Sequence, residues 1–406
     1  MSVLQLSGPQ KPIDVSLNIG GSKSISNRAL LIRALTNRYF DISNLSDSDD
    51  TQAMETLIAT PRDLYDAHHA GTTFRFLTAF LAIQGGEQIL TGSDRMKQRP
   101  IGPLVEVLNA IGADIKYLNK KGFPPLEIKP FRKQKKNVIS IRSDVSSQYI
   151  SALCMIAPTL EKGLIINLVG ELVSKPYLDM TLKMMKVFGV ESQFENNTIT
   201  VLPQAYEAID YIVESDWSSA SYHFAIASLL KGSAIKLNYF FKDSLQGDSA
   251  ICEIARAFGV SSRFDEHALI LESNLDTALT YKYNFLQQPD IAQTVATMAA
   301  GKSMQMEYSG LKTLYIKETN RVEALKSELK KVNIDLKTDV ENDLYMQTGK
   351  LQIKNPTFET YKDHRMAMAL APLSIIAPIN IADPDVVSKS YPNFWKDLEA
   401  MGFQVS

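Results

Sequence analysis

Residues 89–115, ILTGSDRMKQRPIGPLVEVLNAIGADI, contain the unit from which this chain is built. An extended apolar start leads into a polar loop with serine, aspartate and cations, and an amphipathic helix follows the loop. We expect the helix to end at Gly112, because glycine readily adopts the left-handed conformation that closes many helices. A second extended segment begins directly afterwards. The stretch therefore predicts a strand, a loop, a helix and a strand in one compact unit.

The same order of elements returns along the chain. The further copies are residues 166–192, 237–262, 308–336 and 381–403, and their helices end at Gly189, Gly259, Asn333 and Gly402. These ends lie roughly seventy residues apart, which is too long for a solenoid repeat and fits an α/β unit of several elements. An earlier copy, residues 42–59, ends close before the next one, so we expect the first unit to be short by about one strand pair.

Six such units in a chain of 406 residues predict two pseudo-symmetric α/β domains of three units each. The chain changes from strand to helix start within a few polar residues at two places, Gly20 and residues 213–219. We interpret both places as crossings between the domains. Residues 1–20 with 215–406 then form one discontinuous domain, and residues 21–214 form the other.

The composition argues against several classes of function. The chain has 45% hydrophobic and 22% charged residues and a net charge of -2, so it lacks the basic field typical of proteins that bind nucleic acid or anionic membranes. The start of the chain has no signal-peptide pattern. Neither Cys154 nor Cys252 has metal-ligand spacing, so we expect no metal site and a reducing, cytoplasmic location.

The stretch 20–35, GGSKSISNRALLIRAL, predicts an anion site at the start of a helix. Lys23 stands where the helix dipole disfavours a cation, and Arg28 lies one turn after Ser24. A solvated basic helix start explains these residues equally well. Further cations stand in the polar loops of later units: Arg75, Arg99, Lys317, Arg321, Arg365 and Lys389. Lys317 and Arg321 are expected on one helix face, and the set as a whole favours a phosphorylated or multiply carboxylated small molecule.

Two carboxylates, Asp290 and Glu318, stand among these cations. Asp290 precedes a predicted helix, so an ordinary N-cap is the simpler interpretation. A salt bridge is the alternative interpretation of Glu318, but it is less strongly favoured than the N-cap is for Asp290. If both face a cationic pocket, they can carry protons. Hydroxyl and amide donors are expected from Ser146, Ser147, Gln148, Ser174 and Tyr177.

Nine motifs, in order and almost end to end, resemble the 5-enolpyruvylshikimate-3-phosphate synthase family. They are GSKSISNRALLIRAL, HAGTTFRFLTA, RMKQRPIGPLVEVL, SSQYISALC, SKPYLDMTL, SDWSSASY, QGD, KETNRVEAL and DHRMAMAL. The resemblance implies the two-domain enolpyruvyl transferase fold, an inside-out α/β barrel with three βαβαββ units per domain that closes over substrate. It also implies a monomer that needs no cofactor and transfers the enolpyruvyl group of phosphoenolpyruvate to the 5-hydroxyl of shikimate 3-phosphate, releasing phosphate.

Position by position, the resemblance implies two sets of substrate ligands. Shikimate 3-phosphate is expected to contact Lys23, Ser24, Arg28, Ser146, Ser147, Gln148, Ser174, Tyr177, Asp290 and Lys317. Phosphoenolpyruvate is expected to contact Lys23, Gly71, Arg99, Gln148, Arg321, Arg365 and Lys389. Glu318 would protonate the methylene carbon, Asp290 would accept the proton of the 5-hydroxyl, and Lys23 would neutralise the leaving phosphate.

Some positions depart from the family pattern, but none removes a charged catalytic position. His69 replaces an asparagine, Phe76 a proline and Asn320 an aspartate, and Thr313 stands where an amide often contacts substrate. Two alternatives stay open. A sister transferase that acts on UDP-N-acetylglucosamine generally uses a loop cysteine, whereas both cysteines here lie in apolar runs. A non-catalytic binding protein of the same fold would have lost the two acids or the cations.

Overall fold

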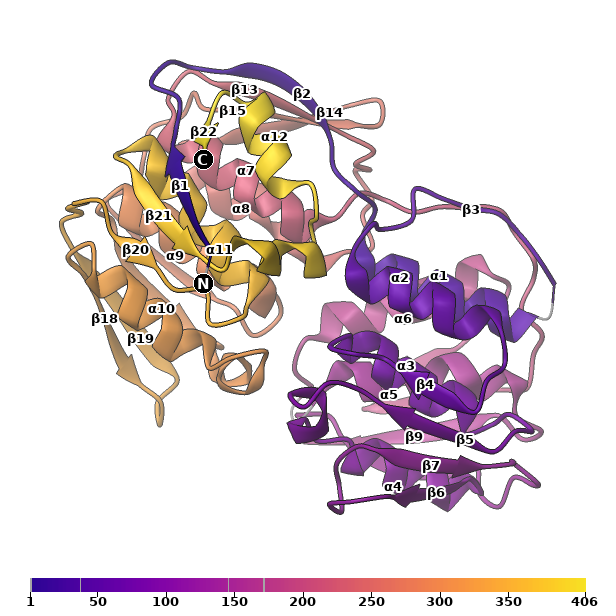
Figure 1. The fold of residues 1–406 in the computed structure, drawn as a ribbon. Helices are drawn as coiled ribbons and strands as arrows, with labels where there is room; N and C mark the ends of the chain where they lie inside the picture. The colour runs from indigo at the N-terminus through magenta and orange to yellow at the C-terminus, as the bar shows by residue number, and fades with distance from the viewer. Residues whose placement is uncertain (1, 37, 145, 171) are drawn as a thin grey trace. The chain divides into compact units, whose positions relative to one another are not determined.

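The computed structural model describes residues 2–36, 38–144, 146–170 and 172–406 (Figure 1). The chain forms two compact units, Met1–Gly20 with Glu214–Ser406, called the first unit, and Gly21–Val213, called the second unit. Glu214 was predicted in the domain of residues 21–214 but belongs to the first unit. The reason is that its carboxylate accepts hydrogen bonds from Trp217 Nε1 at 2.8 Å and from Gln246 Nε2 at 2.9 Å.

In the described residues of the first unit, the strands form three four-stranded sheets. Their strands, in spatial order, are β14 (Ser261–Asp265), β15 (Ala268–Glu272), β13 (Ala234–Asn238) and β2 (Asp14–Asn18); β16 (Thr280–Asn284), β17 (Gln305–Ser309), β19 (Leu344–Gly349) and β18 (Ile334–Asp339); and β20 (Thr357–Phe358), β21 (Ile379–Ala382), β1 (Val3–Ser7) and β22 (Gln404–Val405). Each sheet pairs two strands in parallel and adds two antiparallel strands. This common plan is the repeat that the sequence predicted.

The second unit repeats the plan twice and then shortens it. Its described strands are β4 (Leu64–Asp66), β5 (Gln88–Thr91), β7 (Leu126–Lys129) and β6 (Asp114–Tyr117); β10 (Gln193–Glu195), β11 (Thr198–Val201), β9 (Leu164–Val169) and β8 (Val138–Arg142); and the parallel pair β3 (Ile42–Ser43) and β12 (Tyr211–Ile212). The pair β3 and β12 has no antiparallel hairpin among the described residues. The first repeat along the chain, which lies in the second unit, is therefore short by two strands, as predicted.

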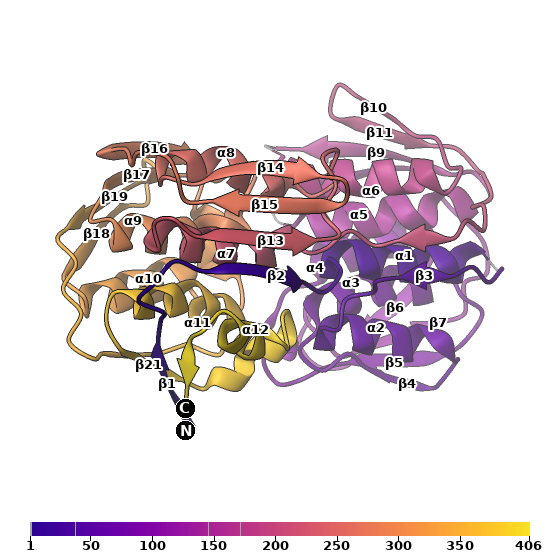
Figure 2. The same ribbon diagram turned by 90° about the horizontal axis from the view of Figure 1, so that it is seen from above.

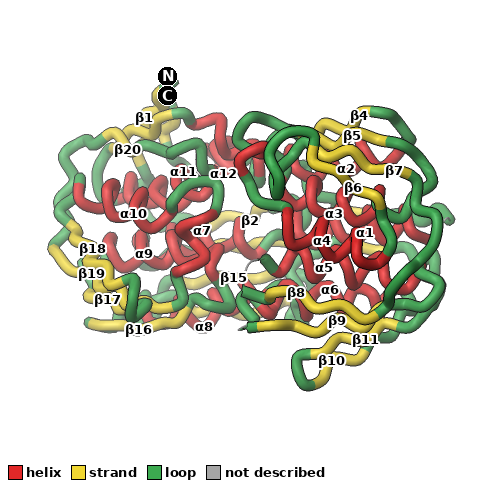
Figure 3. The backbone as a smooth tube through the Cα atoms, turned by 90° about the horizontal axis from the view of Figure 1, so that it is seen from below, coloured by secondary structure: helices red, strands yellow, loops and turns green. Residues whose placement is uncertain are grey.

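Helices lie inside each unit and strands lie on its outside (Figure 3). The helices of the first unit are α7 (Trp217–Leu229), α8 (Ile251–Ile254), α9 (Ala292–Gly301), α10 (Arg321–Lys330), α11 (His364–Leu370) and α12 (Phe394–Ala400). Those of the second unit are α1 (Lys23–Thr36), α2 (Asp49–Ala59), α3 (Gly71–Leu81), α4 (Gly102–Ile111), α5 (Ser147–Ile156) and α6 (Lys175–Val187). α7 and α9 consist mainly of small and apolar residues that are buried on all sides, as is typical of central helices.

The ends of the repeated helices have the predicted backbone conformation. Gly112, Gly189, Gly259, Asn333 and Gly402 all have a positive φ, from 63° at Asn333 to 123° at Gly112. A residue with a Cβ is disfavoured in this region, which explains why four of the five are glycine.

Both ends of the chain lie in one sheet (Figure 2). β1 pairs antiparallel with β21 on one side and with β22 on the other, so Leu6 is aligned with both Ile379 and Val405. The last repeat is thus completed by the first strand of the chain.

Candidate active site

Arg321 lies at the centre of a buried cluster of charges in the first unit. It begins α10, and its side chain is only 2% exposed. Its Nε donates to Asp363 Oδ2 at 2.7 Å, its Nη1 to Asp290 Oδ1 at 3.1 Å and its Nη2 to Glu318 Oε2 at 2.8 Å. Burial lowers the pKa of Arg321, but the three carboxylates outweigh burial and raise this pKa above its ordinary value. The guanidinium therefore stays charged and fixes three acids around itself.

Two more cations reach the same acids. Arg365 Nη2 lies 3.1 Å from Asp290 Oδ2, and Arg365 Nη1 donates to the Asp290 carbonyl at 3.0 Å. Lys389, at the end of a 3₁₀ turn (Pro384–Lys389), donates from Nζ to Glu318 Oε1 at 3.2 Å. Each of the two candidate acids is thus paired with two cations. Such an arrangement suits an anionic ligand that competes with the carboxylates for the cations.

Two local predictions about this cluster are wrong. Asp290 is not an N-cap, because it lies inside a 3₁₀ turn (Pro289–Ile291) and its carboxylate pairs with arginines. Lys317 and Arg321 do not share a helix face, because α10 begins only at Arg321 with the Asn320 side chain as its cap. Burial lowers the pKa of Lys317, while Asp290 and Glu318 act in the opposite direction.

Three further polar residues beside the cluster, Asp248, Ser218 and Asp363, were not among the predicted site residues. Asp248 accepts a hydrogen bond from Ser218 Oγ, which lies 3.4 Å from Arg365 Nη2. Burial raises the pKa of Asp248 to about 7, and repulsion from Asp290 adds to the effect. Asp363 is fully buried. All three lie in quoted motifs, QGD, SDWSSASY and DHRMAMAL, where polar residues stand beside buried apolar ones.

Arg28 forms the corresponding buried network of the second unit. Its Nε donates to Thr181 Oγ1 at 2.7 Å, and its Nη2 donates to Ser151 Oγ and to the Tyr177 carbonyl, both at 3.2 Å. Its Nη1 donates to the Ser24 carbonyl at 2.8 Å. Burial lowers the pKa of Arg28 to about 10. One guanidinium therefore links α1, α5 and α6 and brings Ser24 and Tyr177 together.

Gly71, the first residue of α3, lies against two arginines. A Cβ at Gly71 would overlap Arg99 Nη1 and would lie 2.9 Å from Arg75 Nη1. Arg75 Nη1 donates to the Gly71 carbonyl at 2.7 Å, and Gln148 Nε2 donates to Thr72 Oγ1 at 3.0 Å. The structure thus brings together three of the predicted phosphoenolpyruvate ligands, Gly71, Arg99 and Gln148.

The remaining predicted residues of the second unit lie at helix starts. Lys23 and Ser147 are the first residues of α1 and α5, and Ser146 and Ser174 are the cap residues of α5 and α6. Ser174 has a left-handed φ of 55°, which is unusual for a residue with a side chain. Among the described residues, no side-chain hydrogen bond joins these four to other predicted site residues. Helix starts carry partial positive charge, so the four positions are suited to an anion.

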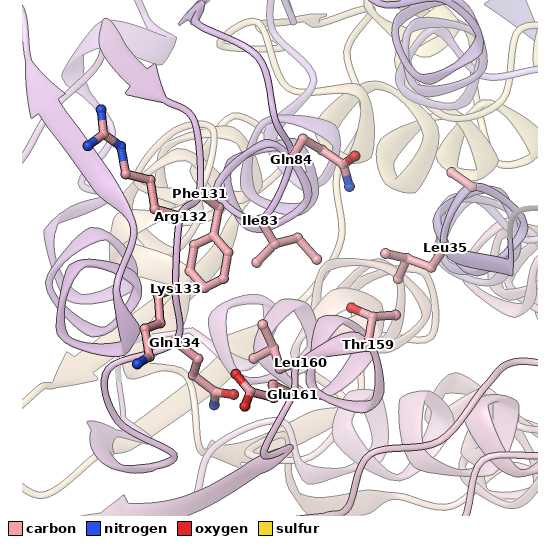
Figure 4. Close-up of a pocket in the computed structure, with 11 residues that line it drawn as sticks. Leu35, Ile83, Gln84, Phe131, Arg132, Lys133, Gln134, Thr159, Leu160 and Glu161 are labelled. Atoms are coloured by element: carbon pink, nitrogen blue, oxygen red, sulfur yellow. The ribbon is translucent and has the colours of Figure 1, made fainter.

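The hollow in Figure 4 is not the predicted substrate site. Its volume is about 310 Å³, and it is lined by Leu35 near the end of α1, Ile83 after α3 and Leu160 after α5, among others. None of the predicted site residues lines it. A helix rises about 1.5 Å per residue, so the length of α5 places the hollow roughly 15 Å from Ser147, at the opposite end of the helices.

The described part of the chain contains neither a cluster of metal ligands nor a membrane-spanning helix. No group of three or more His, Cys, Asp or Glu side chains in it is arranged to hold a metal ion. None of its helices is long and apolar enough to cross a membrane. Both cysteines carry free thiols, and burial raises the pKa of Cys154 to about 12 and that of Cys252 to about 11.

Comparison with known proteins gives full-length matches. The family model described as EPSP synthase (3-phosphoshikimate 1-carboxyvinyltransferase) matches residues 8–60 and 55–398. The 3-phosphoshikimate 1-carboxyvinyltransferase of Bacteroides fragilis is 43% identical over 403 residues, with 98% of each chain covered. The enzyme of that name from Aliivibrio salmonicida is 35% identical over 424 residues, covering 97% of this chain and 98% of its own. A solved EPSP synthase structure from Acinetobacter baumannii has a TM-score of 0.83 at 20% identity, with both chains fully covered, and this likeness shows the fold.

The chain is an α/β protein with the two-domain enolpyruvyl transferase fold. Its repeated four-stranded sheets, with helices inside each unit, and its likeness to the solved structure define this class. The predicted fold class is confirmed. The full-length sequence matches then identify the family, and the chain belongs to the EPSP synthase family.

Proposed function

We infer that this protein transfers the enolpyruvyl group of phosphoenolpyruvate to the 5-hydroxyl of shikimate 3-phosphate and releases phosphate. The reaction belongs to the shikimate pathway, which leads to chorismate and the aromatic amino acids. The observation that carries this conclusion is the match to enzymes named 3-phosphoshikimate 1-carboxyvinyltransferase over 97–98% of the chain. The buried cluster of two candidate acids and several cations supplies the chemistry that the reaction needs.

We propose the following substrate ligands. Shikimate 3-phosphate contacts Lys23, Ser24, Arg28, Ser146, Ser147, Gln148, Ser174, Tyr177, Asp290 and Lys317. Phosphoenolpyruvate contacts Lys23, Gly71, Arg99, Gln148, Arg321, Arg365 and Lys389. The proposal is supported by the contacts inside each unit, which link Gly71 with Arg99 and link Arg321 and Arg365 with Asp290. Arg28 also acts structurally, because it donates four hydrogen bonds within the second unit.

The proposed mechanism begins with proton transfer from Glu318 to the methylene carbon of phosphoenolpyruvate. The adjacent carbon becomes electrophilic, the 5-hydroxyl oxygen attacks it, and Asp290 accepts the hydroxyl proton. The tetrahedral intermediate then loses phosphate, and the ionised Glu318 takes back a proton from the new methyl group, which restores the carbon–carbon double bond. Lys23 neutralises the charge that develops on the leaving phosphate.

The salt bridges of Glu318 bear on this first step. Arg321 and Lys389 favour the ionised carboxylate, which cannot donate a proton. Phosphoenolpyruvate carries a phosphate and a carboxylate that compete for the same two cations. Substrate binding would therefore weaken the pairing of Glu318 and favour its protonation. The two cations would thus exchange Glu318 for the substrate anion, which explains how one site can contain the proton donor Glu318 and also bind an anion.

A phosphate-release assay tests the proposed function. The purified protein is incubated with phosphoenolpyruvate and shikimate 3-phosphate, and inorganic phosphate is measured over time. We expect Glu318→Gln to lower kcat by at least about a hundredfold, since general acid catalysis contributes 10²–10⁴-fold. The matched control is Glu323→Gln, which changes an exposed glutamate of α10, the helix that follows Glu318, and should leave the rate unchanged. Equal rates for wild type and Glu318→Gln would refute the mechanism.

The UDP-N-acetylglucosamine alternative is less well supported. Cys154 lies within α5 and Cys252 within α8, and burial holds both thiols in the protonated form at neutral pH. Neither is a loop cysteine suited to proton transfer. Phosphate release that requires UDP-N-acetylglucosamine instead of shikimate 3-phosphate would reverse this conclusion.

We further propose that the enzyme is a cytoplasmic monomer and that its two domains, residues 1–20 with 214–406 and residues 21–213, close on substrate. The proposed ligands of both substrates come from both domains, which supports closure. Light scattering measures the molar mass, for which we expect a value near 45.2 kDa. Small-angle scattering with both substrates tests closure, and an unchanged radius of gyration would contradict it.

A further inference from the structure

Residues 357–365 run along α10 and carry two members of the charge cluster, Asp363 and Arg365. At one end of this segment, Lys331 Nζ donates to the Thr357 carbonyl at 2.9 Å. At the other end, Arg321 Nε donates to Asp363 Oδ2 at 2.7 Å. The segment is therefore fixed at both ends of a single helix.

Glu328 holds the middle of the segment. Its side chain is fully buried, and it lies seven residues after Arg321, which is about two turns along the same side of α10. Its Oε2 accepts from the Glu359 amide at 2.9 Å, and its Oε1 accepts from the Tyr361 hydroxyl at 2.7 Å. Lys331 Nζ also donates to Oε2, at 2.7 Å. A buried carboxylate with these donors is well compensated, so it can act as a fixed anchor.

The anchored segment contains an unfavourable backbone turn. Tyr361 and Lys362 have φ of 54° and 56°, and consecutive left-handed residues with side chains persist only where their surroundings hold them. The turn leads directly into α11, where Asp363 Oδ1 accepts from the Arg365 amide at 2.9 Å. The conformation of Tyr361 and Lys362 thus determines the position of the backbone at Asp363 and Arg365.

We propose that Glu328 is a positioning residue for phosphoenolpyruvate binding. Through the Glu359 amide and the Tyr361 hydroxyl it holds the left-handed turn, and the turn places Arg365 against Asp290. This inference rests on the proposed function, which assigns Arg365 to phosphoenolpyruvate. Glu328 does not touch substrate, and its effect passes through the turn.

Tyr361→Phe tests the proposal with little disturbance of packing. The variant removes only the hydroxyl, and Tyr361 is 39% exposed, so the ring can keep its surroundings. Tyr239→Phe is a matched control in the same unit, since Tyr239 is 47% exposed and also left-handed, with a φ of 62°. No hydrogen bond of the Tyr239 hydroxyl is found in the described part of the chain. Glu328→Gln is a second variant that keeps an acceptor oxygen but removes the charge.

Steady-state kinetics with each substrate varied in turn separate positioning from general destabilisation. We expect Tyr361→Phe to raise the KM for phosphoenolpyruvate about tenfold, because a hydrogen bond to a charged group is lost. The KM for shikimate 3-phosphate should stay within about twofold of wild type. Glu328→Gln should raise the KM for phosphoenolpyruvate by a smaller factor, and Tyr239→Phe should match wild type.

Three results would overturn the proposal. Wild-type KM values for both substrates in Tyr361→Phe and Glu328→Gln would show that the anchor does not position the site. A fall in kcat with less folded protein and unchanged KM values would show a merely structural role. A wild-type enzyme without any turnover would refute the proposed function and this inference together, whereas an active wild type with unchanged variants refutes only the inference.

Discussion

Removing the Arg321 guanidinium should destabilise the first unit strongly. Arg321→Ala leaves the fully buried Asp363 carboxylate without its 2.7 Å partner and takes away the cation that Asp290 and Glu318 share. Loss of one partner of a buried ion pair costs about 3–5 kcal/mol. Each kcal/mol lowers the Tm of a domain of this size by about 2–4 °C, so we expect a fall of roughly 6–20 °C.

Calorimetry of wild type, Arg321→Ala and Arg263→Ala measures this effect. Arg263 pairs with Glu272 at 3.6 Å in the same unit, but its side chain is 59% exposed. Exposed pairs contribute about 0–1 kcal/mol, so the Tm of Arg263→Ala should stay within about 4 °C of wild type. If Arg321→Ala melts as close to wild type as Arg263→Ala does, the buried carboxylate does not depend on the guanidinium and the reasoning is refuted.

Two further predictions concern pH and substrate affinity. Burial raises the pKa of Asp248 to about 7, so the folded state binds more protons than the unfolded state between about pH 4 and 7, and its stability falls as the pH rises through this range. Asp248→Asn should flatten this part of the curve in urea titrations, and parallel curves for the two proteins would contradict the prediction. Gly71→Ala should displace the Arg99 side chain and raise the KM for phosphoenolpyruvate about tenfold, since one charged hydrogen bond is disturbed. Gly85→Ala, whose added Cβ meets no atom within 4 Å, is its control, and equal KM values for the two variants would count against a role of Gly71.

Local features of the fold could be predicted from the sequence because they depend on neighbouring residues. The helix ends at Gly112 and Asn333 follow from the need for a positive φ, which short-range pattern and residue type indicate. The strand pair missing from the first repeat could be inferred from the short spacing between the ends of the first two repeated helices, near Ala59 and at Gly112. The motifs then located most members of the charge cluster, because they hold polar residues at helix starts.

Features that depend on distant parts of the chain could not be predicted in this way. The pairing of Leu6 with Val405 joins the two ends of the chain, and no local pattern in either strand indicates its partner. The ion pairs of Asp290 could not be predicted for a similar reason, since its pairing with Arg321 and Arg365 is set by tertiary packing. A local cap was the simpler interpretation until the packing of η5 (Pro289–Ile291) near α10 and α11 was known.

The most direct test of the central claim is the stoichiometry of the reaction, measured by phosphorus NMR. The purified protein is incubated with phosphoenolpyruvate alone and then with shikimate 3-phosphate added. We predict no phosphate in the first sample and, in the second, one phosphate released for each carboxyvinyl ether formed at the 5-hydroxyl. Phosphate release from phosphoenolpyruvate alone, or release without formation of the ether, would contradict the assignment of this protein as an enolpyruvyl transferase.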